Sequence, residues 1–115
     1  MKVINLKNNA LLADKALLAD NFCSRLIGLL NRQSLGAGEA LILKPACSIH
    51  TLFMRFSIDV LFLDKTGKVI AALPSLKPFR LSPLYFQSIS VIELPETTIR
   101  LTNTQPGDTI QITPE

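Results

Sequence analysis

The chain has 115 residues, of which 48% are hydrophobic and 18% are charged. This length and apolar content favour one domain with one core, spanning residues 1–115, and exclude a disordered chain. The formal net charge of +3 comes from sparsely spaced lysines and arginines, unlike the clusters of a nucleic-acid-binding surface. No apolar run approaches the roughly 20 residues that a membrane helix needs, and no signal peptide is recognisable. We therefore expect a cytoplasmic protein with no membrane contact.

The first part of the chain predicts a hairpin followed by a helix. Residues 2–6 suit a strand, and ALLADKALLAD at residues 10–20 repeats ALLAD with an offset of six, a multiple of the strand period of two. The two asparagines between these segments suit a turn. Near residues 21–32 the apolar residues recur at i, i+4, i+7 and i+8, which predicts one short helix with Arg25 on its other face.

The rest of the chain predicts short strands joined by turns. Residues 64–67 suit a tight turn, and three prolines between residues 74 and 87 predict a long surface loop there. The predicted strands are 40–44, 52–56, 58–63, 68–73, 90–94, 98–102 and 109–113. Six or more short strands with one helix predict a mainly β fold, a small closed or nearly closed β-barrel.

Four stretches carry a family resemblance: RLIGLLNR at 25–32, IHTLFMRFSIDVLFLD at 49–64, VIELPETTI at 91–99 and PGDTIQI at 106–112. Together they resemble the DUF192 family, a group of small, mostly prokaryotic proteins of uncharacterised function. The family pattern falls on Arg25, Gly28, Leu29, Phe53, Met54, Ile58, Asp59, Phe62, Glu93, Gly107 and Asp108. The chain departs from it at Leu30, where Met is usual, and at Glu96 and Thr97, where a small residue and Gly are usual. The resemblance implies a mainly β, barrel-like single domain and names no reaction.

Asp59 is the residue that most needs a partner. In the predicted strand 58–63, alternate side chains face opposite sides of the sheet, and both sides are apolar apart from Asp59. A buried carboxylate must be hydrogen-bonded or paired, and its candidate partners are Arg25, His50, Arg55 and backbone N–H groups. Asp59 therefore has two interpretations, a structural acceptor or a ligand-binding or catalytic carboxylate.

Cys47 and His50 raise a thiol hypothesis. If the two side chains meet in a turn after Pro45, the imidazole can activate the thiol as a nucleophile. Packing at a loop or sheet edge is the alternative. With one histidine and two cysteines the chain has too few ligands for an ordinary zinc site, so we expect no metal and no cofactor.

A second candidate region lies in the proline-rich loop. Lys77, Phe79, Arg80 and Tyr85 mix cationic and aromatic side chains on an irregular segment, which is typical of a surface that contacts a protein or a ligand. A loop that buries its aromatic side chains on its own domain has the same composition. Both interpretations stay open at this point.

We expect a non-catalytic domain that binds a small anionic ligand or a protein. Its predicted site is polar, lies around His50, Arg55 and Asp59, and has Arg25 and the proline-rich loop at its rim. The first alternative is a small enzyme that uses Cys47 and His50 as a thiol nucleophile, or Asp59 in acid/base catalysis. The second is a weak binder of single-stranded nucleic acid, for which the basic residues are few.

Overall fold

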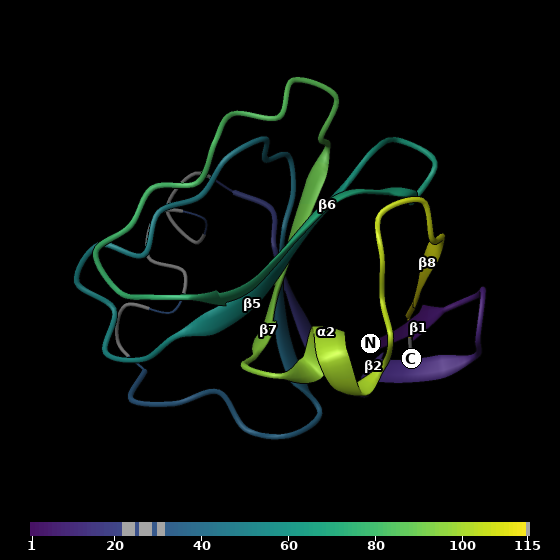
Figure 1. Ribbon diagram of the computed structural model, residues 1–115, viewed down its shortest axis with the longest axis horizontal. Coiled ribbons are helices and arrows are strands. Elements are labelled where there is room, and N and C mark those ends of the chain that lie inside the picture. The colour runs from purple at the N-terminus through teal and green to yellow at the C-terminus, as the bar shows by residue number, and fades with distance from the viewer. Residues whose placement is uncertain (22–24, 26–28, 30–31, 115) are drawn as a thin grey trace.

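The computed structural model describes residues 1–21, 25, 29 and 32–114. Within these residues eight strands form two sheets, and one short helix follows the seventh strand (Figure 1). The elements are β1 (Lys2–Asn5), β2 (Ala10–Ala13), β3 (Lys15–Ala19), β4 (Glu39–Leu43), β5 (Ile58–Leu63), β6 (Val69–Leu76), β7 (Ser90–Pro95), α2 (Thr98–Leu101) and β8 (Ile110–Thr113).

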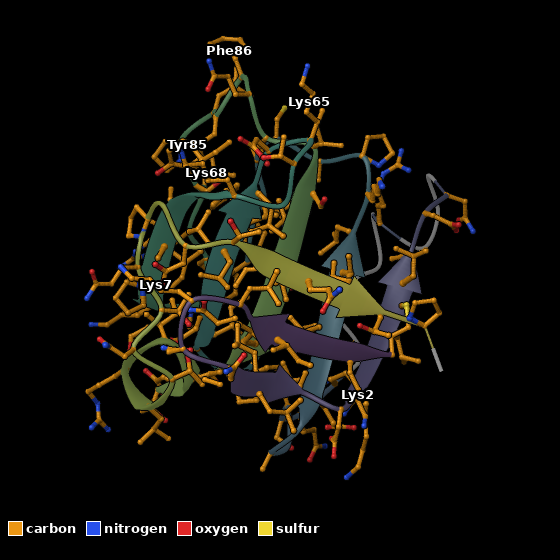
Figure 2. All side chains as sticks on the ribbon, turned by 90° about the vertical axis from the view of Figure 1, so that its right-hand side faces the viewer. Lys2, Lys7, Lys65, Lys68, Tyr85 and Phe86 are labelled. Atoms are coloured by element: carbon orange, nitrogen blue, oxygen red, sulfur yellow. The ribbon has the colours of Figure 1, made fainter. Side chains whose placement is uncertain are left out.

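The two sheets lie face to face, and their strands cross (Figure 2). The smaller sheet has the strand order β2-β1-β8 and is antiparallel throughout. The larger sheet has the order β3-β4-β7-β5-β6, in which β3 and β4 are parallel and the other neighbours are antiparallel. The prediction of a mainly β fold is confirmed. The prediction was a closed or nearly closed barrel; the described residues form no closed barrel, because their strands form two sheets, which an isolated bridge between Lys68 and Thr109 links.

The larger sheet has a hydrophobic core on each of its faces. One core lies between the sheets and includes Leu61 and Leu63, while the other includes Val60 and Phe62 and is covered by loops. Every residue of β5 is buried, and its side chains alternate between the two cores as the strand period requires. Burial on both sides explains why this strand reads as an almost continuous apolar run.

Two predicted strands are wrong. Residues 52–56 form turns and bends, because Phe53 has a φ of 64°, which turns the backbone away from an extended course. Residues 98–102 contain α2, which follows Thr97 at a φ of 77°. The predicted loop also starts too early, since β6 runs on through Pro74 to Leu76 at the edge of the sheet, where a missing N–H is tolerated.

The predicted helix near residues 21–32 lies largely outside the described residues. The repeat at residues 10–20 is confirmed as strand, with a break at Asp14 that the hairpin interpretation did not include. Its first half, β2, pairs with β1, whereas its second half, β3, joins the other sheet beside β4.

Candidate functional site

Asp59 is completely buried and is held by two backbone groups. Its Oδ1 accepts a hydrogen bond from the N–H of Ser75 at 2.9 Å, and its Oδ2 accepts one from the N–H of Ile99 at 2.8 Å. The carboxylate thus joins β5 to the end of β6 and to the first turn of α2. This geometry agrees with the structural interpretation of Asp59.

The four residues expected to form a ligand site have separate surroundings. Arg25 donates to a backbone carbonyl five residues earlier, at 3.2 Å. The Nδ1 of His50 accepts a hydrogen bond from the backbone N–H two residues later, at 3.3 Å. Arg55 is exposed, and no ion pair or hydrogen bond joins it to another described residue. Among the described contacts, none of these three side chains reaches Asp59.

Cys47 is a half-buried free cysteine whose backbone, rather than its thiol, makes the described contact. Its carbonyl accepts the N–H of Tyr85 at 2.9 Å. No described hydrogen bond joins the thiol to the imidazole of His50. In the part of the chain that the structure describes, no group of three or more histidine, cysteine or acidic side chains is placed to hold a metal ion.

Two loops, residues 44–57 and 77–89, are hydrogen-bonded along their length, and we call them the paired loops. In Figure 1 they run beside each other along the left of the molecule. His50 and Leu81 form an antiparallel bridge, and the N–H of Ser82 donates to the carbonyl of Ile49 at 2.9 Å. These bonds hold together two segments that contain no regular strand.

Thr51 is the centre of the pairing. It is fully buried; its N–H donates to the carbonyl of Arg80 at 2.8 Å, and its carbonyl accepts the N–H of Phe79 at 2.9 Å. Its hydroxyl donates to the carbonyl of Lys77 at 2.6 Å and accepts the N–H of Arg80 at 2.9 Å. One side chain therefore fixes the backbone course of the tip of the second loop.

At this tip two phenylalanines contact each other and solvent. The rings of Phe53 and Phe79 meet edge to face, with their centroids 5.6 Å apart, yet the residues are 74% and 57% exposed. Both have left-handed backbone conformations, with φ values of 64° and 61°. Such a conformation is strained for a bulky residue, and strain of this kind is concentrated at functional sites.

The paired loops expose further apolar side chains beyond this tip. Leu81 is 72% exposed, Leu84 52% and Phe86 86%. Figure 2 shows Phe86 projecting from the top of the molecule, beyond Tyr85. Tyr85 itself is half-buried and packs on Phe62 at a centroid distance of 4.5 Å. Of the four predicted contact residues in this loop, Lys77, Phe79 and Arg80 are thus exposed, and Tyr85 anchors the loop to the sheet.

The charge of the paired loops is all of one sign. They contain four basic residues, Lys44, Arg55, Lys77 and Arg80, and none of the nine acidic residues of the chain. The remainder of the chain has eight basic and nine acidic residues, so the loops carry the whole net positive charge. All four cations are exposed.

Glu93 is an unusual group that the sequence-based site did not include. It lies in the middle of β7 and is 3% exposed. It pairs in register with Leu41 and Val60, which pack in the core that the loops cover. Its Oε2 has no hydrogen-bond partner. Burial raises the pKa of this carboxyl to about 8. Its position inside the apolar run VIEL was the signal in the sequence.

A polar hollow of about 170 Å³ lies at the other end of the molecule, beside β1. Its acidic wall is Asp108, which accepts hydrogen bonds at 2.9 Å from the amide of Asn5 and from the N–H of Gln105. The bond from Asn5 is the largest cause that lowers the pKa of Asp108. The carboxylate of the family Gly-Asp motif is therefore engaged in joining β1 to the turn before β8. The hollow is lined by Lys7, Asn8, Asn103, Gln105 and Asp108.

These features define a class of protein: a small β domain of two crossed sheets with a basic, apolar loop surface. The model of the DUF192 family, described as "Uncharacterized ACR, COG1430", matches residues 3–112. The chain belongs to this family, as the motifs in its sequence indicated.

Two relatives agree with this assignment. The chain is 33% identical to a UPF0127 protein of Pyrococcus furiosus, over 81% of this chain and 82% of that protein. It is 30% identical to a UPF0127 protein of Pyrococcus abyssi, over 95% of each.

Two crystal structures share the fold at 18% identity. A protein of unknown function from Novosphingobium aromaticivorans superposes with a TM-score of 0.83, over 96% of this chain and 82% of that chain. A putative transcription regulator from Sinorhizobium meliloti superposes with a TM-score of 0.78, over 96% of this chain and 89% of that chain. At this identity the likeness concerns the fold alone.

Proposed function

We propose that this protein is a non-catalytic binding domain that docks an anionic partner on the paired loops. The observation that carries the proposal is the exposed contact between Phe53 and Phe79, both in left-handed backbone conformations, on loops that contain four cations and no acidic residue. A contact between aromatic rings at a rigid tip provides apolar area at low entropic cost. The surrounding cations attract partners of opposite charge.

Two buried side chains hold the backbone of this surface, or the backbone next to it, in position. Thr51 sets the course of the second loop, and Asp59 fixes the N–H of Ser75 immediately before that loop begins. Asp59 is accordingly a positioning residue in the proposal, while His50 and Arg55 stay within the docking surface. A surface fixed in this way loses little conformational freedom when a partner binds.

Backbone amide NMR of the isotope-labelled protein tests this function. Three anionic probes are titrated separately: an acidic peptide, phospholipid nanodiscs containing an anionic lipid, and a single-stranded oligonucleotide. We expect at least one probe to shift resonances of residues 49–56 and 77–86 and to leave those of β1, β2 and β8 unchanged. A Lys77→Glu/Arg80→Glu variant should lose this response.

The control variant is Lys2→Glu/Lys15→Glu, which makes the same change of charge on exposed residues outside the paired loops. The proposal fails if none of the probes binds at low salt, or if the shifted resonances lie outside the paired loops. It also fails if the two double variants weaken binding equally, since the loops would then have no special role.

A further inference from the structure

We propose that the anionic partner of the paired loops is a lipid surface, which they enter as a peripheral anchor; this inference rests on the function proposed above. The described residues contain no helix that is long and apolar enough to cross a bilayer. A peripheral contact needs no such helix, because apolar side chains and cations on loops can enter the headgroup region. The inference revises the expectation from the sequence, which considered only a spanning segment.

Several apolar side chains of the paired loops are exposed to solvent. Phe86 is 86% exposed, Phe53 74% and Leu81 72%. A protein partner would need a matching cavity for each projecting group, whereas lipids rearrange around it. The transfer of aromatic and leucine side chains from water to the boundary between headgroups and acyl chains also lowers the free energy.

Part of the backbone of the paired loops is hydrogen-bonded within the pair. A peptide group that loses water at the membrane interface without gaining a partner is costly, so each internal hydrogen bond of the loops lowers the cost of entry. Here the amides of Thr51, Phe79, Arg80 and Ser82 all donate within the pair. The prolines of the loops, Pro45, Pro78 and Pro83, have no N–H to satisfy.

The charges of the paired loops suit an anionic bilayer. Lys77 and Arg80 flank Phe79 at the tip, and Arg55 lies two residues after Phe53. Cations beside projecting apolar groups lie at the level of the headgroups when those groups enter the membrane. Without an acidic residue in either loop, nothing in the paired loops opposes this attraction.

The chain has no tryptophan, which allows a direct test. Phe53→Trp and Phe79→Trp each place a single reporter at the tip, and Leu101→Trp places one on α2, where Leu101 is 72% exposed. Vesicles of phosphatidylcholine with about 30% phosphatidylglycerol provide the anionic surface. We expect a blue shift of fluorescence and quenching by brominated lipid for both tip reporters, and neither effect for Leu101→Trp.

Vesicle sedimentation measures the charge dependence in the unlabelled protein. Lys77→Glu/Arg80→Glu should lower the partition coefficient about fivefold or more for each cation, and Lys2→Glu/Lys15→Glu should change it much less. Phe53→Ser/Phe79→Ser should lower it at least about tenfold. Circular dichroism and the unchanged NMR signals of β1 and β8 confirm that each variant is folded.

Each outcome decides the matter. Binding to anionic but not to neutral vesicles, with responses at the tip reporters, supports the inference. Absence of binding at low salt, equal responses of the tip and α2 reporters, or equal loss in the two charge variants overturns it. If the paired loops bind the acidic peptide or the oligonucleotide and not the vesicles, the lipid inference falls and the proposed function stands. If they bind none of the probes, both fall.

Discussion

Glu93 should make the protein less stable as the pH rises. Burial raises the pKa of its carboxyl from 4.5 to about 8 in the folded protein, while in the unfolded chain it keeps its ordinary value. Between these two values the unfolded chain releases the proton of Glu93 and the folded protein retains it. Fewer protons are bound in the unfolded state, so the free energy of unfolding falls with increasing pH. Below the lower value and above the higher one, Glu93 contributes no slope.

The size of this effect follows from the burial of the carboxyl. The difference between 4.5 and about 8, at 1.36 kcal/mol for each pH unit, gives a total loss of at most about 5 kcal/mol. The slope reaches about 1.4 kcal/mol per pH unit in the middle of this range. Because whole domains are stable by only about 5–15 kcal/mol, such a loss is large enough to be measured easily.

Urea denaturation followed by circular dichroism, at intervals from pH 5 to pH 8, provides the assay. Glu93→Gln and Glu93→Leu remove the titrating group, and subtracting their profiles from that of the parent protein removes the contribution of every other residue. Gln leaves a buried amide without partners at all pH values, so the slopes are compared rather than the absolute stabilities. The reasoning is refuted if the three profiles are parallel, because Glu93 would then be ionised in the folded protein or hydrated.

Three further variants test other parts of the structure. Asp59→Ala leaves the N–H groups of Ser75 and Ile99 without the buried carboxylate that accepts their partly buried hydrogen bonds, and it should cost about 2–6 kcal/mol in urea denaturation; a loss below about 1 kcal/mol would contradict the structural role. Thr97→Gly restores the usual family residue at a φ of 77° and should raise the stability by about 1 kcal/mol, whereas a decrease would show that the position is unstrained. Cys47→Ser should change the affinity of the paired loops by less than about twofold; loss of binding would assign the thiol a direct role.

The sequence predicted the strands whose side chains alternate between two apolar environments. The alternation in residues 58–63 correctly assigned Val60 and Phe62 to one face and Leu61 and Leu63 to the other. The pattern of a strand depends only on its own residues and on burial, so it can be recognised locally. The arrangement of those strands in two sheets depends on pairing between distant segments, so the sequence could not show that the described strands form no closed barrel.

The elements that were missed depend on contacts made at long range. Residues 98–102 have the composition of a strand, yet the carboxylate of Asp59, 40 residues earlier, accepts the N–H of Ile99 and supports a helical turn. Residues 52–56 alternate like a core strand, yet Thr51 binds the second loop and Phe53 takes a left-handed conformation. A local pattern contains no information about such partners.

Part of the candidate site could be predicted from the sequence. The mixture of cations and aromatics at residues 77–85 indicated a contact surface, and the resemblance already marked Glu93 and Phe53. The sequence could not show that the second loop pairs with residues 44–57, since that pairing follows from the fold. Nor could it show that Asp59 faces backbone amides rather than Arg55.

The pairing of β1 with β8 restricts the order in which this protein can fold during synthesis. Lys2 lies opposite Thr113, so β1 cannot pair on this side until β8 has left the ribosome. Until then β1 has only β2 as a neighbour, and the amide of Asn5 lacks the carboxylate of Asp108. A two-stranded hairpin is marginally stable in water. The smaller sheet should consequently become protected from hydrogen exchange only after β8 has left the ribosome, which pulse labelling of nascent chains stalled before and after β8 can measure.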